Sequence, residues 1–117
     1  MKPKIAKIGW KAVIKVKMLP SDAHYKGGLV AGAKVLELFG DAATKLCVRE
    51  SGYEGLFRAY ESVDFLAPVY AGDTVTATAI IVKVGTTSRQ MKFVAINHNK
   101  VIISNALGTV VIPELKK

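Results

Sequence analysis

Residues 29–52 read LVAGAKVLELFGDAATKLCVRESG, and their apolar side chains recur every three or four positions. The apolar face consists of Leu29, Ala33, Leu36, Phe39 or Gly40, Ala43 and Leu46 or Cys47. A second stripe is charged and consists of Lys34, Glu37, Asp41, Lys45 and Arg49. This period predicts an amphipathic helix of about six turns that begins at Leu29. Gly52 suits the left-handed conformation that ends many helices, so Ser51 and Gly52 are expected to close it.

Five segments around this helix have the composition and patterning of β-strands. The segment 10–18 alternates lysines with apolar residues, and four later segments are rich in Val, Ile, Thr, Phe or Tyr: 55–66, 73–84, 88–97 and 101–112. The turns between the last four contain Pro, Gly or Asn and are short enough for antiparallel hairpins or meanders. A sheet with one apolar face needs a cover, and one helix is long enough to provide it. The predicted fold is therefore α+β, a curved five-stranded antiparallel sheet wrapped around one long central helix.

The composition fits a single domain over residues 1–117, in which residues 1–9 form an N-terminal extension before the first strand. Hydrophobic residues make up 50% and charged residues 22% of the chain, as in globular proteins. No apolar run resembles a signal peptide or a membrane span, and Cys47 is the only cysteine, so we expect a cytoplasmic protein without disulfides. Open sheet edges and a small core favour a homo-oligomer.

The chain is basic, with 17 Lys and Arg against 9 Asp and Glu and a net charge of +8. This charge favours an anionic partner such as nucleic acid, an acidic membrane surface or the phosphates of coenzyme A. The basic residues are scattered and no nucleic-acid motif is present, so we expect binding to neither nucleic acid nor a membrane. The two histidines, His24 and His98, lie far apart and Cys47 lies in the apolar helix, which predicts no metal site.

Two stretches, VKMLPSDA (16–23) and FLAPVYAGD (65–73), together with the order of the elements, resemble the hotdog acyl-CoA superfamily. Within it, the sequence resembles the 3-aminobutyryl-CoA ammonia lyases in four stretches: SDAHYKGGLV (21–30), LFGDAAT (38–44), EGLFRAYESVDFLAPV (54–69) and VGTTSRQMKF (84–93). The likeness covers most of the chain from Val16 onward.

The resemblance implies elimination of ammonia from a short 3-aminoacyl-CoA to give the 2-enoyl-CoA, crotonyl-CoA for the four-carbon substrate, in amino-acid (lysine) fermentation. It implies no cofactor other than the coenzyme A that the substrate carries. It also implies a homodimer or a hexamer built as a trimer of dimers, because hotdog sites resemble clefts shared between two subunits. An acyl-CoA thioesterase is the alternative enzyme, and a non-catalytic acyl-CoA binding protein is a further alternative.

The predicted loop 21–28 carries candidate site residues. The sequence around Asp22 resembles the stretch in which hydroxybenzoyl-CoA-type hotdog thioesterases carry a catalytic carboxylate, which makes Asp22 a candidate acid or base. A turn aspartate that hydrogen-bonds to its own backbone explains Asp22 equally well. His24 is a candidate proton carrier and Tyr25 a candidate hydrogen-bond donor to the amine or the carbonyl, although a loop histidine is also often simply solvated.

Elimination also needs donors for the enolate oxygen, which backbone N–H groups at a helix start can supply. With the helix beginning at Leu29, the amides of Gly28 and Leu29 are the predicted donors. Gly27 and Gly28 would let a thioester approach the backbone closely, and their alternative explanation is a flexible turn.

Two further carboxylates are catalytic candidates. Asp41 lies among small residues, although its place in the charged stripe, in a solvated ion-pair row with Glu37 and Lys45 at four-residue spacing, is the explanation that spacing alone favours. Another class of hotdog thioesterases carries its catalytic aspartate near this point, yet Gly40 matches that position, which counts against simple hydrolysis. Glu61 on the second strand could reach the site of another subunit, and a solvent-facing carboxylate is its alternative explanation.

A basic hairpin completes the prediction. Four of its side chains could bind coenzyme A phosphates, Arg as a bidentate fork and Lys as a point charge: Lys83, Ser88, Arg89 and Lys92. A hairpin kept soluble by its charge is the alternative.

Overall fold

The computed structural model describes residues 6–113 and contains five strands and one long helix. In chain order these are β1 (Lys11–Lys17), two 3-10 turns (Pro20–Asp22 and Lys26–Gly28), α1 (Gly32–Ser51), β2 (Leu56–Phe65), β3 (Thr74–Val84), β4 (Ser88–Asn97) and β5 (Ile102–Val111). All five predicted strands are present, and their ends lie within one residue of the expected positions.

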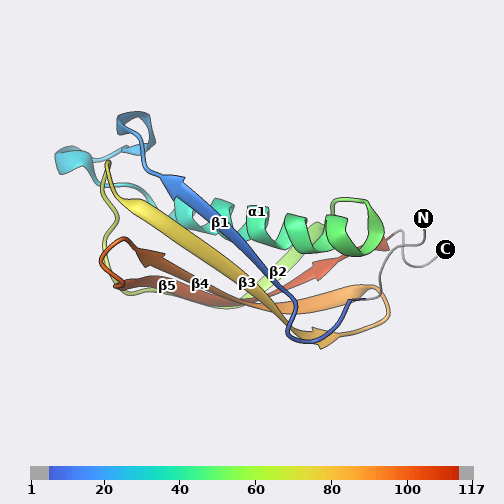
Figure 1. The fold of residues 1–117 in the computed structure, drawn as a ribbon. Helices are drawn as coiled ribbons and strands as arrows, with labels where there is room; N and C mark the ends of the chain where they lie inside the picture. Colours follow the sequence, from blue (N-terminus) through green and yellow to red (C-terminus); the bar gives the residue numbers. More distant parts are fainter. Residues whose placement is uncertain (1–5, 114–117) are drawn as a thin grey trace.

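The strands form one antiparallel sheet in the order β1-β3-β4-β5-β2. The sheet curves around α1, which lies along one of its faces (Figure 1). The predicted fold class, a five-stranded sheet wrapped around a central helix, is thus confirmed.

The connection from β2 to β3 differs from the predicted hairpin. Residues 66–73 carry the chain from one edge of the sheet to the other side, because β2 pairs with β5 and not with β3. This crossing passes the start of α1, where Leu66 N–H donates to Ile103 O at 2.7 Å and Val30 N–H donates to Val69 O at 2.8 Å. The segments before α1 and after β2 therefore meet at one end of the molecule.

The helix begins three residues later than its apolar pattern predicts. Leu29 and Val30 are extended and form isolated bridges with Tyr70 and Ala23, so their backbones are engaged outside the helix. The end of the helix is as expected: Gly52 has φ 80° and its N–H donates to Val48 O at 2.8 Å. With 20 residues, α1 is about 30 Å long.

The core lies between α1 and the inner face of β3 and β4. Every second residue of these strands is buried, and small alanines at Ala77, Ala79 and Ala95 let the helix approach the sheet closely. Phe93 is fully buried on β4 and stacks on Phe39 of α1 with ring centroids 5.2 Å apart. The curved sheet and its small residues together hold α1 in place.

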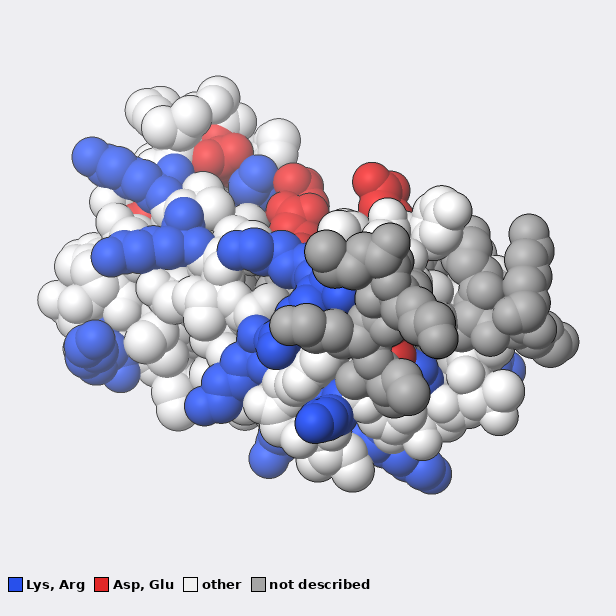
Figure 2. Space-filling model, turned by 45° about the vertical axis from the view of Figure 1, so that its right-hand side comes forward, with Lys and Arg blue, Asp and Glu red and all other residues white. Residues whose placement is uncertain are grey.

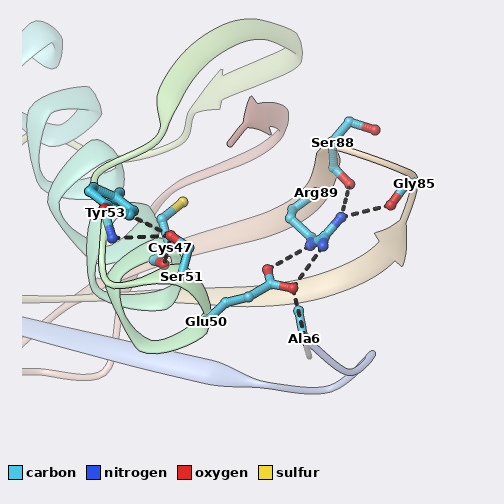
Figure 3. A network of polar contacts seen from close by, with 8 residues as sticks. All are labelled: Ala6, Cys47, Glu50, Ser51, Tyr53, Gly85, Ser88 and Arg89. Atoms are coloured by element: carbon cyan, nitrogen blue, oxygen red, sulfur yellow. Dashed lines mark hydrogen bonds and ion pairs between the residues drawn. The ribbon is translucent and has the colours of Figure 1, made fainter. Parts of the chain in front are cut away.

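A buried ion pair fixes the far end of α1 (Figure 3). Arg89 donates to both carboxylate oxygens of Glu50, from Nε at 2.8 Å and from Nη2 at 2.7 Å, and both side chains are 4% exposed. Ala6 N–H donates to Glu50 Oε2 at 2.8 Å, so residue 6 of the predicted N-terminal extension packs against the domain. Residues 1–5 of that extension lie outside the described residues.

Trp10 lies beside the same end of the helix, with Arg49 Cζ 3.8 Å from the centroid of its ring. One turn earlier on the same face of α1, Lys45 Nζ donates to Val13 O at 3.1 Å. Lys45 therefore turns toward β1 and not toward Asp41, with which the alternative explanation of Asp41 paired it. Within residues 6–113, no helix has the length and apolar character needed to cross a membrane.

Candidate active site

Three hollows of the surface meet at the first turn of α1, and Ala33 lines all of them. An apolar cleft of about 450 Å³ is lined chiefly by Tyr25, Val30, Val35, Phe65, Val69 and Ile103. An α1–β2 groove of about 460 Å³ is lined by Leu36, Glu37, Gly40, Phe57, Arg58 and Tyr60, among others. A polar hollow of about 260 Å³ is lined by Ser21, Asp22, His24, Lys34 and Glu37.

The start of the helix offers backbone donors to these hollows. Ala31, the residue before the first turn, is extended and provides no side-chain cap. The N–H groups of Gly32 and Ala33 have no acceptor within an α-helix, and they stand at the positive end of its dipole. Lys34 N–H, by contrast, donates to Ala31 O at 3.0 Å. Gly32 and Ala33 are therefore the amides suited to a developing negative charge.

Gly32 is also the point where the helix start touches the end of β2. A Cβ atom at Gly32 would lie only 2.7 Å from Cε1 of Phe65. The glycine thus lets the Phe65 ring lie against the first turn and form a wall of the apolar cleft.

The prediction that Gly28 and Leu29 belong to the first helical turn is wrong. Gly27 and Gly28 have φ values of 75° and 77°, which L side chains rarely adopt, so both glycines are required by the 3-10 turn itself. Gly28 O accepts from Ala71 N–H at 2.8 Å, and Leu29 bridges to Tyr70. Contact of these residues with a thioester stays a prediction.

Asp22 has the geometry of the turn aspartate that was its alternative explanation. Its Oδ2 accepts from Leu19 N–H at 2.7 Å, and its Oδ1 lies 3.6 Å from Lys34 Nζ. The hydrogen bond from Leu19 lowers the pKa of Asp22, and Lys34 adds to this effect. Asp22 is therefore held as a carboxylate at neutral pH.

His24 and Tyr25 are both exposed and lie at different hollows. His24 lines the polar hollow, while Tyr25 lines the apolar cleft and is 59% exposed. Their N–H groups donate to Leu29 O at 3.2 and 3.3 Å, which holds the loop against the segment before α1. Their catalytic roles stay predictions.

Asp41 and Glu61 line none of the three hollows. Asp41 is exposed on α1 one turn beyond Glu37. Glu61 is the extra residue of a β-bulge in β2, is exposed, and accepts from Thr109 Oγ1 at 2.7 Å. Within residues 6–113 of one chain, neither carboxylate is brought to the start of the helix.

Arg89 is not a surface residue of the basic hairpin. Besides its bonds to Glu50, its Nη1 donates to Gly85 O and Ser88 O at 2.8 and 2.7 Å, so four hydrogen bonds engage all three nitrogens of the buried guanidinium (Figure 3). The prediction that Arg89 binds a phosphate is wrong for this reason.

Lys83 and Lys92 are exposed and Ser88 is half-buried, so these three remain accessible. Lys83 and Ser88 flank the Gly85 turn, which the Glu50–Arg89 pair ties to the far end of α1, about 25 Å along the helix from Ala33, where the three hollows meet. Lysine and arginine side chains are spread widely over the face displayed in Figure 2, whereas the acidic ones lie mainly along its upper side. Phosphate contacts of Lys83, Ser88 and Lys92 stay a prediction.

Comparison with known proteins identifies the family. Residues 27–99 match the model of the thioesterase superfamily. The chain belongs to this superfamily.

Among curated proteins of this family, the 3-aminobutyryl-CoA ammonia lyase of Acetoanaerobium sticklandii is 42% identical over 92% of this chain and 98% of its own length. Among solved structures, the β-alanyl-CoA:ammonia lyase from Clostridium propionicum is 32% identical, with a TM-score of 0.86 over 92% of this chain and 88% of that one. The predicted resemblance to ammonia lyases is confirmed.

The hotdog fold is shared more widely in the superfamily. An acyl-CoA hydrolase from Staphylococcus aureus, solved with butyryl coenzyme A, is 20% identical and has a TM-score of 0.74 over 86% of this chain and 62% of that one. At this identity the likeness concerns the fold alone.

Glu37 and Tyr60 line the α1–β2 groove, and neither was predicted from the sequence as a site residue. Glu37 was placed in the charged stripe, and it also lines the polar hollow. Tyr60 donates its hydroxyl to Leu36 O at 3.2 Å, and burial raises its pKa to about 12, so it stays a phenol. The four-residue spacing of Ala33 and Glu37 was the available signal, because it places them on one helix face. Within residues 6–113, no group of three or more His, Cys, Asp or Glu is arranged to hold a metal ion.

Cys47 is expected to resist thiol reagents in the folded protein. Its side chain is buried, and desolvation raises its pKa to about 11, so almost no thiolate exists at pH 8. Iodoacetamide should label it at least tenfold more slowly in buffer than in 6 M guanidinium chloride, as measured by mass spectrometry. Equal rates would contradict the packing of the thiol in the core.

Proposed function

We propose that this protein is an ammonia lyase that eliminates ammonia from a short 3-aminoacyl-CoA, such as 3-aminobutyryl-CoA, to give the 2-enoyl-CoA. The observation that carries this proposal is the 42% identity to a 3-aminobutyryl-CoA ammonia lyase over nearly the whole of both chains. The solved β-alanyl-CoA:ammonia lyase, which has the same fold at 32% identity, supports the same reaction class.

The start of α1 suits the charge that develops in this reaction. A base removes a proton from C2, the electron pair moves toward the thioester carbonyl, and an enolate oxygen forms. When the enolate collapses, the C2–C3 double bond forms and the C3–N bond breaks, so the ammonium leaves as neutral ammonia. The N–H groups of Gly32 and Ala33 would stabilise the enolate oxygen, as donors aimed at a developing oxyanion do.

The hollows suit a small acyl group. Phe65 and Val69 line the apolar cleft together with Gly32, and Ala33 lines both this cleft and the polar hollow. We propose that coenzyme A enters only as part of the substrate and that no other cofactor takes part. Arg58 in the α1–β2 groove and the exposed Lys83 and Lys92 are the basic residues available to its phosphates.

A second subunit is part of the proposal. β2 is an edge strand, most of its side chains are exposed, and it lines the groove beside α1. An exposed edge of this length is a template for pairing with another chain. We propose a homodimer in which β2 supplies the shared edge, with a trimer of such dimers as the larger assembly.

One assay separates the lyase from the alternatives. With crotonyl-CoA and ammonium, a lyase consumes the enoyl absorbance only when ammonium is present and releases no free thiol. A thioesterase, which the superfamily also contains, would release thiol without ammonium. No turnover together with saturable binding of crotonyl-CoA would instead indicate a binding protein.

A further inference from the structure

Glu37 is the carboxylate of the three hollows that is available to a ligand. Asp22 is the other acidic residue lining them, and one of its oxygens is committed to Leu19 N–H at 2.7 Å. The Glu37 side chain is 62% exposed, and its only hydrogen-bond or ion-pair partner within residues 6–113 is Lys34 Nζ, at 3.4 Å from Oε1. It borders both the polar hollow and the α1–β2 groove, which meet at Ala33.

Glu37 stands one helical turn beyond the amides of Gly32 and Ala33. Residues four apart share a helix face, and the rise between Ala33 and Glu37 is about 6 Å. Helical side chains lean toward the N-terminus, and the contact of Glu37 with Lys34, three residues earlier, is in this direction. A carboxylate at Glu37 is therefore placed beyond the point where the thioester oxygen would bind.

The substrate matches this spacing. In a 3-aminoacyl-CoA the nitrogen is three bonds from the carbonyl carbon. With the thioester oxygen at the Gly32 and Ala33 amides, an acyl chain running along the helix brings this nitrogen to the Glu37 side chain. The wall of the groove there is open, because Gly40, one turn farther, has no atom within 4 Å of where its Cβ would stand.

The charges beside Glu37 leave room for one more cation. Lys34 Nζ is shared between Glu37 Oε1 at 3.4 Å and Asp22 Oδ1 at 3.6 Å. These two carboxylates and one ammonium carry a net charge of −1, and Arg58, which also lines the α1–β2 groove, forms no ion pair with either carboxylate among residues 6–113. An ammonium group would neutralise this cluster, whereas the hydroxyl of a 3-hydroxyacyl-CoA would not.

We infer that Glu37 binds the 3-ammonium group of the substrate and thereby makes the site select ammonia over water. This inference rests on the proposed lyase function and names the residue that sets its specificity. Lys34, held between Glu37 and Asp22, orients the carboxylate.

The test is the dependence of crotonyl-CoA amination on ammonium at fixed pH, with ionic strength held constant by potassium chloride. Glu37→Gln keeps the shape and removes the charge, so the KM for ammonium should rise about tenfold or more, the loss of a charged hydrogen bond. The KM for crotonyl-CoA should change less than twofold. Glu37→Asp keeps the charge on a shorter side chain and should give an intermediate KM for ammonium.

Glu54→Gln is the matched control, because Glu54 is exposed in the loop after α1 and lines none of the hollows. It should leave both KM values unchanged. Thermal unfolding of each variant checks that the fold is retained, as expected for a residue as exposed as Glu37.

A binding measurement makes the test independent of turnover. The wild-type protein should bind 3-aminobutyryl-CoA more tightly than 3-hydroxybutyryl-CoA, and Glu37→Gln should abolish this difference. An unchanged KM for ammonium in an active Glu37→Gln variant, or a lower kcat at unchanged KM, would overturn the role of Glu37 but leave the lyase function standing. A wild-type protein that never consumes crotonyl-CoA with ammonium would overturn the function itself.

Discussion

Replacing Gly32 with proline is expected to lower the kcat of ammonia elimination by a factor of about 10² to 10³, the effect of removing one oxyanion-hole donor. Proline lacks the N–H group but is favoured at the first position of a helix. Ala31 already has φ −66° and ψ 145°, the extended conformation that a residue before proline adopts. The helix should therefore begin at the same residue, with one donor fewer.

The side chain at position 32 needs its own control, because any Cβ there meets the Phe65 ring. Gly32→Ala introduces the same Cβ and keeps the N–H. Both variants should be made with Phe65→Leu, which shortens the side chain they would meet. In this background the alanine variant should retain most of the kcat of Phe65→Leu alone. Equal kcat values for the proline and alanine variants would show that the thioester oxygen does not bind this amide.

Replacing Arg89 with methionine is expected to lower the free energy of unfolding by about 3–5 kcal/mol, because Glu50 would remain as a buried charge without its partner. The carbonyls of Gly85 and Ser88 would lose their donor as well. Urea unfolding followed by circular dichroism measures the change.

The double variant Arg89→Met with Glu50→Leu should recover part of the loss, since no unpaired charge stays buried. Arg49→Met is the surface comparison: it removes an exposed cation from the face of Trp10 and should lower the free energy of unfolding by about 0.5–1 kcal/mol. A loss at Arg89 as small as that at Arg49 would contradict a buried pair.

Local patterns predicted the elements well, because each pattern reflects one buried face. The alternating burial of β3 and the three-and-four spacing of α1 follow directly from the residue order. The start of the helix could not be read in this way. Leu29 continues the apolar spacing, but its backbone bridges to Tyr70, more than forty residues later. The position of β2 beside β5 likewise depends on how the chain crosses the sheet.

The sequence indicated which segments line the hollows, but not which side chains are accessible there. Residues of loop 21–28 and of the helix start line the hollows, whereas their roles in catalysis stay predictions. Arg89 is taken up by Glu50, which lies 39 residues earlier, and no local pattern links the two. Glu37 was absent because helical periodicity shows which face a residue is on, not which hollows open there. Asp41, one turn farther, looked equivalent in the sequence and borders none of them.

The contact between Trp10 and Arg49 has a practical use. Trp10 is the only tryptophan of the chain, and Arg49 lies about 25 Å along α1 from Gly32. Intrinsic fluorescence excited at the indole therefore reports, without any added dye, whether the end of the helix farthest from the hollows is intact. An acyl-CoA that binds at the other end of α1 should therefore change this emission less than unfolding does.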